Sequence, residues 1–418
     1  MPKNILCTWG ALAVLPTLLS AQTVFKSAGQ VVIPQSNSVR STDSTRTRMH
    51  TNLRYLVPEA AGTPVQAAGS PPFAGYLFET PASIGCIYNL VRHPHRGCNP
   101  NVVTENPSGG GGAIAVVDAY DNPTAQSDLD DFCTQFGLPH TTVNVVYATG
   151  TNPGLDPTGG WEIEESLDVQ WSHAMAPDAK IFLVEAASNF NDDLLAAVGV
   201  ANQLVMDAGG GEVSMSWGNS ESPDELTLDS FFTAQGVVYF ASTGDNPGTI
   251  WPSVSPNVVA AGGTSLSRDL NTGDFVLESA WQDGGGGMSL FESRPSFQDS
   301  LRHVVGATRG VPDLSFDSNP ASGVWVLATS GAGGAPAGWY TVGGTSVASP
   351  SLAGISNAAG AFRSSSQAEN SFNYKNGRGF RDISYGNCGI YMANFTGNGW
   401  DFCTGLGTPQ GAARHRGD

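Results

Sequence analysis

The sequence predicts an α/β fold in which a central, mostly parallel sheet carries helices on both faces. Two patterns favour this class: short apolar runs of strand character recur along the chain, and helix-like stretches lie between them. Strands buried on both faces are continuous apolar runs, and their alternation with helices is typical of parallel sheets. The 418 residues are 40% hydrophobic, which is enough for a sizeable core in one large domain with leader segments.

The predicted elements follow one another in a regular order. The strand-like runs are AIAVVDAY, KIFLVEA, EVSMSW, VVYFAS and NVVAAGG, at residues 113–120, 180–186, 212–217, 237–242 and 257–263. The helix-like stretches lie at residues 124–137, 162–176, 192–208 and 226–236. The alternation therefore extends over most of the middle of the chain.

The N-terminal region has the pattern of an export signal and a leader. Residues 1–21 combine Lys3 with an apolar run, as a secretory signal peptide does, so we expect a secreted protein. Residues 22–75 are rich in Ser, Thr, Gln and Pro without a clear period, which predicts a linker or short propeptide remnant. The organised domain is expected over residues 76–410 and a tail over 411–418.

Export would leave five cysteines, and an oxidising compartment favours bridges between them. No C-x-x-C pair occurs, so zinc and thioredoxin-like sites are disfavoured. Proximity in sequence predicts two local disulfides, Cys86–Cys98 and Cys388–Cys403. Cys133 is then left as a buried thiol.

The charge of the chain limits its partners. Acidic residues outnumber basic ones by 37 to 19, which gives a formal charge of −18. Nucleic acid and anionic membranes are therefore disfavoured as partners. A low-lysine, acidic surface suits an acidic medium, although the demands of solubility alone explain it equally well.

Ser346 is the candidate nucleophile. It lies in GGTSVASPSLAGISNAAGAF, residues 343–362, where two glycines permit a sharp turn before a helix of small residues. Free N–H groups and the dipole at a helix start favour a developing negative charge and can form part of an oxyanion hole. An ordinary N-cap serine is the alternative interpretation.

Glu164 and Asp168 are the candidate proton-handling groups, because a serine hydroxyl needs a base. They are four residues apart on one predicted helix, at the edge of its apolar stripe. A proton shared between two such carboxyls raises one apparent pKa, and a carboxylate can act as a base at a pH where histidine is protonated. A solvated acidic run is the alternative. His173, on the same helix, is expected to be structural.

Asp245 is the third candidate carboxyl and lies in YFASTGDNPG, residues 239–248, where a predicted strand ends at Ala241 and a Gly-Asp turn follows. An Asp before Asn-Pro-Gly is most often a turn residue. At the carboxyl end of a strand, however, it lies at the usual edge for α/β active sites. A protonated Asp245 could donate a hydrogen bond to an oxyanion, whereas an ionised one would repel it.

The chain resembles the sedolisin family, the serine-carboxyl peptidases, from about residue 76 to about residue 410. The resemblance rests on ordered blocks: IAVVDAYDNP, WEIEESLDVQ with MAPDAKI, VSMSWGNSE, ASTGDNPG, GGGGMSLFESRPSFQ, RGVPDLSF, GGTSVASP, and RDISYGN with GNGWDFCTGLGTP. It implies a subtilisin-like three-layer fold. It also implies that Ser346 is the nucleophile, Glu164 the base, Asp168 its orienting partner, and Asp245 part of the oxyanion hole. Ser216, Trp217 and Gly218 resemble the strand that pairs with substrate backbone.

The resemblance also implies one structural Ca²⁺ in the C-terminal loop 380–408. Its ligands would be Asp382, the carbonyls of Ile383, Gly397 and Gly399, and Asp401, a mixture of oxygens that calcium accepts. A glycine-rich surface loop is the alternative. The family usually carries a long folded prodomain, whereas only residues 22–75 lie between the predicted signal and the first matching region, which puts a zymogen step in doubt.

These inferences together predict a secreted, acid-active endopeptidase that works through an acyl-enzyme. We expect protein or peptide substrates, a monomer, no nucleic acid, and no membrane after signal removal. Two alternatives remain open at this point. One is a subtilisin-type Ser-His-Asp protease using Asp118 and a histidine, and the other is an inactive secreted binding protein of the same fold.

Overall fold

A computed structural model describes residues 29–37, 48–58, 68–360, 364–375, 377–389 and 395–411. The predicted signal peptide 1–21 lies outside these ranges, as does the predicted tail apart from Gly411. Within the described ranges, none of the helices combines the length and the apolar character needed to cross a bilayer.

An eight-stranded sheet forms the centre of the molecule. Its strands are β3 (Ala113–Ala119), β4 (Val143–Tyr147), β5 (Lys180–Ala186), β6 (Gly211–Met215), β8 (Val237–Ser242), β10 (Val259–Arg268), β11 (Phe275–Ala280) and β14 (Leu314–Asp317). The order is β11-β10-β8-β6-β3-β5-β4, with β14 also paired to β10. All pairs are parallel except β10 with β11. The predicted, mostly parallel sheet is confirmed.

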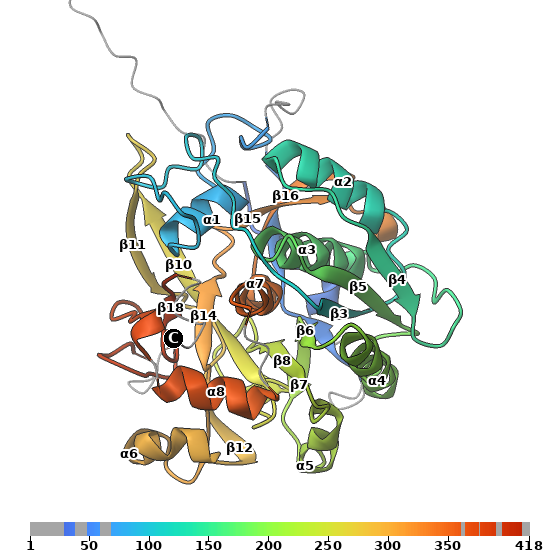
Figure 1. The fold of residues 1–418 in the computed structure, drawn as a ribbon, viewed down its shortest axis with the longest axis vertical. Coiled ribbons are helices and arrows are strands. Elements are labelled where there is room, and N and C mark those ends of the chain that lie inside the picture. Colours follow the sequence, from blue (N-terminus) through green and yellow to red (C-terminus); the bar gives the residue numbers. More distant parts are fainter. Residues whose placement is uncertain are drawn as a thin grey trace, which may run out of the picture.

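Helices cover both faces of this sheet. Helices α3 (Gly160–Met175) and α7 (Thr345–Ala358) pack together on one face, and α4 (Asn191–Asp207) covers the other (Figure 1). The side chains of β3 alternate between the two layers: Ile114 and Val116 belong to the core with α3 and α7, and Val117 to the core with α4. The same alternation directs Asp118 toward α3, where the candidate site lies.

The sequence located β3, β5, β8, α2 (Ala125–Phe136), α3 and α4 within two residues. Strands β4, β11 and β14 were not predicted, and β10 continues to Arg268, beyond the predicted 257–263. Two further stretches differ. EVSMSW does not continue as one strand, because the chain leaves the sheet after β6 and forms β7 (Trp217–Ser220), which pairs with β1 (His50–Thr51) and β9 (Ile250–Trp251) instead. Residues 226–236 form only the short α5 (Glu225–Leu228) and a 3-10 turn, η2 (Asp229–Phe232), since little of this stretch is buried.

The remaining elements are short and surround the central layers. They are η1 (Gln35–Asn37), β2 (Arg54–Leu56), α1 (Pro81–Ile87), α2 (Ala125–Phe136), β12 (Gly287–Ser293), η3 (Ser296–Leu301), α6 (Arg302–Val305), β13 (Thr308–Val311), β15 (Val324–Ala328), η4 (Ala332–Gly334), β16 (Gly338–Gly343), α8 (Ser366–Lys375), η5 (Gly377–Gly379), β17 (Phe380–Arg381) and β18 (Thr408–Pro409).

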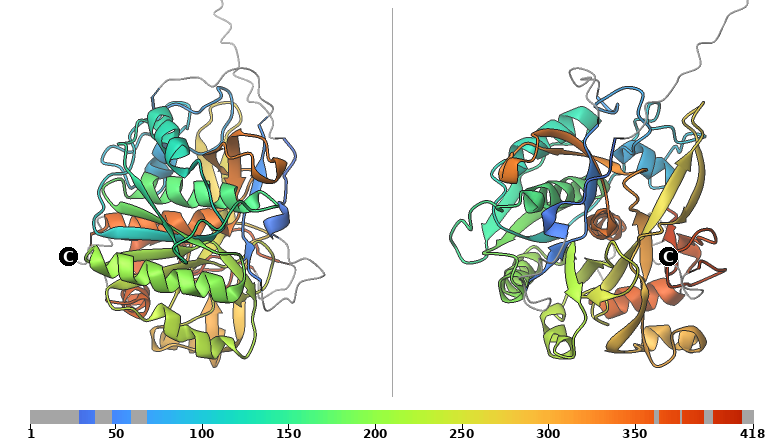
Figure 2. Two further views of the ribbon diagram at one scale, coloured as in Figure 1. Left: turned by 90° about the vertical axis from the view of Figure 1, so that its right-hand side faces the viewer. Right: turned by 180° about the vertical axis from the view of Figure 1, so that it is seen from behind.

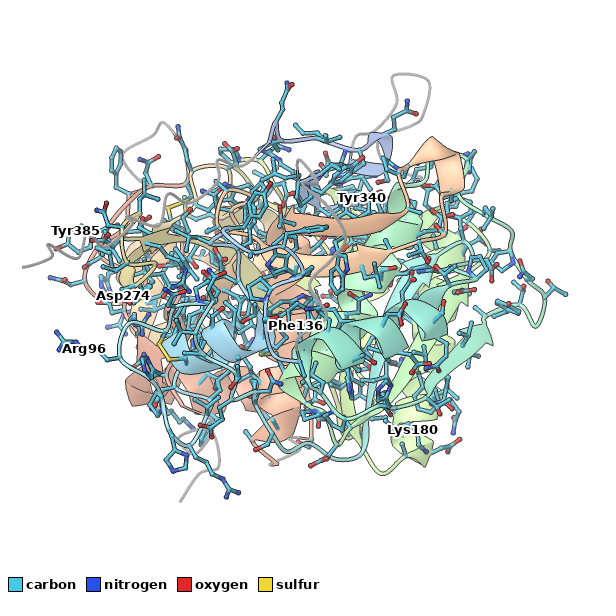
Figure 3. The ribbon with its side chains drawn as sticks, turned by 90° about the horizontal axis from the view of Figure 1, so that it is seen from above. Arg96, Phe136, Lys180, Asp274, Tyr340 and Tyr385 are labelled. Atoms are coloured by element: carbon cyan, nitrogen blue, oxygen red, sulfur yellow. A yellow bond between two sulfur atoms is a disulfide. The ribbon has the colours of Figure 1, made fainter. Side chains whose placement is uncertain are left out.

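An N-terminal segment, residues 48–56, is built into the fold. Strand β1 lies antiparallel to β7, and β2 lies antiparallel to β16. Seen from behind, the blue segment runs across the molecule beside the orange strands (Figure 2). Tyr55 of β2 packs edge-on against Tyr340 of β16, which is labelled in Figure 3, with ring centroids 5.2 Å apart. This part of the predicted leader therefore pairs with strands that border the candidate site.

The cysteine pairing expected from sequence is confirmed. Disulfides join Cys86 to Cys98 and Cys388 to Cys403, with Cα–Cα distances of 5.5 and 5.3 Å. Cys133, on α2, is a buried free thiol. Burial raises the pKa of Cys133 to about 12, which leaves it protonated and unreactive.

Candidate active site

Ser346 lies in the first turn of α7 and is fully buried. The turn before it requires glycine at position 344, where φ is 101°. A Cβ at Gly344 would collide with the Asn52 carbonyl oxygen and lie 2.7 Å from Asp245 Oδ2. The glycine-rich approach thus lets other chain segments come close to the start of the helix.

Glu164 meets Ser346 directly. Ser346 Oγ donates to Glu164 Oε2 at 2.9 Å and lies 3.1 Å from the carbonyl oxygen of Ser216. Glu164 comes from α3, and its side chain is fully buried. A nucleophile and a base within hydrogen-bond reach are what serine-type acyl transfer requires.

Asp168 lies one helical turn after Glu164, also fully buried. Its Oδ1 accepts a hydrogen bond from Ser216 Oγ at 2.8 Å. Burial and the charges of Asp168 and Asp118 raise the pKa of Glu164 well above its ordinary range. Burial and the charge of Asp118 do the same for the pKa of Asp168. Buried carboxyls that interact this strongly titrate together, so that the protons belong to the group and not to single residues.

Asp118 is the third carboxyl of this set. It stands near the carboxyl end of β3, fully buried, and neither of its oxygens has a hydrogen-bond partner within the described structure. Burial raises the pKa of Asp118 to about 8. None of the hydrogen bonds that Ser346, Glu164 and Asp118 form in the described ranges involves a histidine. His173 instead lies against the Pro139 carbonyl oxygen, with Nε2 at 2.7 Å.

Asp245 follows β8 and lies beside the start of α7. Its Oδ1 accepts from Thr345 N at 2.8 Å and from Thr345 Oγ1 at 3.1 Å, and its Oδ2 accepts from Asn37 Nδ2 at 3.1 Å. Arg54 Nε is 3.9 Å from Oδ2. Burial, partly opposed by these donors and by Arg54, raises the pKa of Asp245 to about 7. In an acidic medium its carboxyl therefore keeps its proton.

The segment Ser216, Trp217 and Gly218 passes next to Ser346. Trp217 Nε1 donates to the Val117 carbonyl oxygen at 2.7 Å, which fixes β7 against the sheet. The backbone of Trp217 and Gly218 pairs with Thr51 and His50 of β1. The strand expected to bind substrate backbone thus has a strand of the same chain beside it.

The structure brings the predicted calcium ligands together only in pairs, Asp382 with Gly399 and Asp401 with Gly397. Gly399 N donates to Asp382 Oδ2 at 2.9 Å, and Gly397 N donates to Asp401 Oδ2 at 3.0 Å. Asp401 Oδ1 accepts from Cys403 N at 2.9 Å, and Ile383 is buried. The two carboxylates fit a calcium ion by chemistry, whereas the glycines face them with amides rather than carbonyls. No cluster of three or more His, Cys, Asp or Glu suited to a metal occurs in the described ranges.

Three residues near the site were missed by the sequence reasoning. Asn37, Asn52 and Arg54 contact Asp245 or Ser346, and all three lie in the stretch interpreted as leader. The available signal was weak: Leu53, Arg54 and Tyr55 show one short alternation of apolar and polar residues, as a half-buried strand does.

Solved structures with this fold are known. Pseudomonas sedolisin, a serine-carboxyl proteinase complexed with two molecules of pseudo-iodotyrostatin, superposes with a TM-score of 0.63 at 24% identity, covering 80% of this chain and 95% of that one. A structure described as an S41 psychrophilic protease gives a TM-score of 0.54 at 19% identity, covering 82% of this chain and 99% of the other. These likenesses confirm the predicted subtilisin-like fold.

Sequence relatives give the family, although no protein-family model matches the chain. Kumamolisin from Bacillus sp. (strain MN-32) is 30% identical in an alignment of 357 residues that covers 73% of this chain and 60% of that protein. Sedolisin from Pseudomonas sp. (strain 101) is 27% identical over 331 residues, 67% of this chain and 53% of that protein. The chain belongs to the sedolisin family.

A further relative carries a different name. Tripeptidyl-peptidase 1 from Dictyostelium discoideum is 28% identical over 363 residues, 74% of this chain and 55% of that protein. The chain thus spans between 53% and 60% of the length of these three curated relatives.

Proposed function

We propose that this sedolisin-family chain is a serine-type peptidase that hydrolyses peptide bonds in proteins or peptides. The observation that carries the proposal is the buried hydrogen bond of 2.9 Å from Ser346 Oγ to Glu164 Oε2. A solvated acidic run would leave Glu164 exposed, and an ordinary N-cap serine would have no need of a buried carboxylate. A histidine base is not supported, because His173 lies against Pro139 instead.

The proposed reaction is acyl transfer. Glu164 takes the proton of Ser346 while Ser346 Oγ attacks the carbonyl carbon of the substrate. The Glu164 carboxyl then protonates the departing amine. Asp168, held by Ser216, orients Glu164 and shares its proton. Protonated Asp245 and the Ser346 N–H stabilise the oxyanion, and water hydrolyses the acyl-enzyme.

Acid activity follows from the kinds of group at this site. The coupled set of Glu164, Asp168 and Asp118 must lose a proton before Glu164 can accept one from Ser346. The Ser346 and Ser216 hydroxyls favour that ionisation by donating to Glu164 and Asp168. Asp245 has the opposite requirement and must stay protonated. The Asp245 pKa of about 7 sets the upper end of the window. The first ionisation of the coupled carboxyl set, whose pKa burial moves upward, sets its lower end.

We further propose secretion, a monomeric state and one structural calcium ion. The two disulfides support export to an oxidising compartment, and the charge of −18 disfavours nucleic acid. Calcium would be held by Asp382 and Asp401, with the Ile383, Gly397 and Gly399 carbonyls after a local change in the loop. Its chemistry there would be a clamp of hard oxygen ligands around the C-terminal loop.

A peptide-library digest tests the proposed activity. The purified chain and its Ser346→Ala variant are incubated with a mixed peptide library at about pH 4, well below the reference pKa of histidine. Mass spectrometry should find internal cuts only with the unmodified enzyme. Equal cutting by both proteins, or no cutting by either, would contradict the proposal and favour an inactive binding protein.

A further inference from the structure

Asp245 lies in a turn, residues 244–249, that joins β8 to β9 and is called the Asp245 turn below. Gly244 and Asp245 are buried, whereas the tip of the turn, residues 246–248, is exposed and Thr249 is half-buried. An exposed tip has no core contacts to fix its position. The placement of the Asp245 carboxyl therefore depends on the hydrogen bonds that hold this turn.

The side chain of Glu221 holds the far end of the Asp245 turn. Glu221 directly follows β7, and its Oε1 accepts a hydrogen bond from Thr249 Oγ1. Its Oε2 accepts from Ser289 Oγ at 2.5 Å and from Leu290 N at 3.0 Å. One carboxylate thus ties together the end of β7, the start of β9 and the strand β12. Strands β7 and β12 lie at the same end of the molecule as α5 (Figure 1).

A glycine run fastens the other parts of the Asp245 turn. Gly285 N donates to the Gly244 carbonyl oxygen at 2.8 Å, and Gly286 N donates to the Gly248 carbonyl oxygen at 2.7 Å. A Cβ at Gly285 would lie 2.0 Å from the Thr243 carbonyl oxygen, so only glycine permits this approach. The run leads directly into β12, the same strand that the carboxylate binds. The turn is therefore part of a closed circuit of hydrogen bonds.

This circuit matters for the reaction because of where it places Asp245. Asp245 Oδ1 accepts from Thr345 N at 2.8 Å, one residue before the nucleophile Ser346. The proposed oxyanion donors are the Ser346 N–H and the protonated Asp245 carboxyl. A displacement of about 1 Å is enough to weaken a donor of this kind.

We infer that Glu221 is a positioning residue: through Thr249 and β12 it keeps the Asp245 carboxyl buried beside the nucleophile. The inference rests on the proposed function, since the effect of Glu221 on the reaction passes through the proposed oxyanion donor. Glu221 is distinct from the candidate residues that the sequence identified.

Charged groups from several elements face the two carboxyls. Within the described residues, those around Asp245 are Arg54 on β2 and Glu164 on α3. Those around Glu221 are Glu225 on α5 and Glu292 on β12, with Asp229 on η2 and Arg309 on β13 acting on Glu292. Burial raises the pKa of Glu225 and that of Glu292 to about 8. Neither of these two therefore loses its proton below the Asp245 pKa.

Loosening of the turn should lower the pKa of Asp245. Burial is the largest influence on this carboxyl and raises its pKa to about 7, against the opposing effects of its hydrogen-bond donors and of Arg54. Water that reaches a displaced carboxyl weakens the effect of burial and moves the pKa toward the ordinary value of about 3.9. The proton that the oxyanion needs is then lost at a lower pH, so the alkaline limb of kcat/KM moves downward.

Variants of Thr249 test the inference, because they change the contact and leave the carboxylate in place. Thr249→Val keeps the shape without the hydroxyl, whereas Thr249→Ser keeps the hydroxyl. With a peptide that the unmodified enzyme cuts, Thr249→Val and Glu221→Ala should move the alkaline limb downward by about one pH unit. Their kcat should fall by about 10-fold, with a smaller change in KM. Thr249→Ser should keep the limb of the unmodified enzyme.

Two further comparisons make the pH profile decisive. Glu225→Gln is the matched control, because glutamine has the shape of the neutral acid and Glu225 does not bind the Asp245 turn; its alkaline limb should not move. In the Asp245→Asn background, where position 245 cannot titrate, Thr249→Val should cause no further shift. A shift that persists there would overturn the inference. A limb unmoved in both Glu221→Ala and Thr249→Val would also overturn it.

Carbon-13 NMR of aspartate-labelled protein separates this inference from the proposed function. The carboxyl signal of Asp245 is assigned by its absence in Asp245→Asn, and its titration midpoint should be lower in Thr249→Val than in the unmodified chain. A chain without peptidase activity that shows this shift would overturn the proposed function and support the placement of Asp245 by Glu221. An active chain without the shift would overturn the inference alone, and an inactive chain without it would overturn both.

Discussion

Ser346 Oγ donates a hydrogen bond to Glu164 Oε2 at 2.9 Å, and neither side chain is exposed to solvent. The two residues come from the starts of α7 and α3, the helices that pack together on one face of the sheet. Their meeting therefore depends on the core of the domain and not on a mobile loop. A carboxylate in this place lets a serine react at a pH where a histidine base would be protonated.

Asp168 should affect the reaction through Glu164. Its Oδ1 accepts from Ser216 Oγ, so Asp168→Asn keeps the shape but removes the charge and the shared proton. We expect kcat to fall by about 10² to 10⁴-fold with a smaller change in KM. Ser216→Ala is the matched control. It removes one hydrogen bond, and its kcat should fall less than that of Asp168→Asn. Unchanged kcat in Asp168→Asn would show that Glu164 acts without this partner.

Asp245 should set the alkaline limit of activity. Burial raises its pKa to about 7, so the proton needed by the oxyanion is present below that pH and lost above it. Asparagine donates a hydrogen bond without a titrating proton. In the pH profile of kcat/KM, the alkaline limb of Asp245→Asn should therefore move upward, with some loss of peak rate. An unmoved limb would show that another group controls it.

Protein stability should fall as pH rises from acid to neutral. Burial raises the pKa of Glu185 to about 8 and that of Glu162 to about 7. Between the ordinary glutamate pKa and these values, the folded state binds more protons than the unfolded state, so the free energy of unfolding decreases with pH. Urea unfolding at about pH 4 and about pH 8 measures the difference.

Glu185→Gln provides the matched variant for this pH dependence. Glutamine has the shape of the neutral acid, so the variant should lose part of the decrease in stability between these two pH values, on the order of a few kcal/mol. Equal pH dependence in the variant and the unmodified protein would show that Glu185 ionises in the folded state at its ordinary pKa.

Calcium should raise the melting temperature if the C-terminal loop binds it. A ligand that binds only the folded state stabilises it by mass action. Adding calcium after chelation should restore several degrees of Tm, by the usual conversion of a free-energy change of about 1 to 3 kcal/mol. Asp382→Asn should abolish this response. Asp401 accepts from Cys403 N through Oδ1 and from Gly397 N through Oδ2. Because asparagine has only one acceptor oxygen, Asp401→Asn is expected to lower Tm even without calcium. An unchanged Tm of the unmodified chain on addition of calcium would contradict the proposed calcium site.

The sequence was most informative where local pattern decides structure. The run KIFLVEA has the bounds of β5, and its continuous apolar stretch, residues 181–184, is typical of a strand covered on both faces. Residues 226–236 were predicted as a helix, but only the short α5 and the 3-10 turn η2 form there, since few of these residues have a core to pack against. The candidate residues on α3 and α7 could be identified because each lies within a short sequence motif on a single helix.

Long-range pairing was beyond the reach of the sequence. Asn52 meets Ser346 only because β1 and β2 add to β7 and β16, and no local pattern in a stretch rich in Ser and Thr indicates such partners. The burial of Asp118 beside Glu164 is likewise a long-range contact that no local sequence pattern indicates. Asp118 was considered as the acid of a histidine-based triad, whereas the structure surrounds it with other carboxyls.

The rate of peptide cleavage by Glu164→Gln at about pH 4 tests the central claim most directly. Its kcat/KM would be compared with that of the unmodified enzyme, Ser346→Ala, the double variant and His173→Ala. We predict losses of several orders of magnitude for Glu164→Gln and Ser346→Ala and no further loss in the double variant, because the two groups act as a unit. His173→Ala, as far as it remains folded, should keep its activity. An active Glu164→Gln together with a folded but inactive His173→Ala would contradict the carboxylate mechanism.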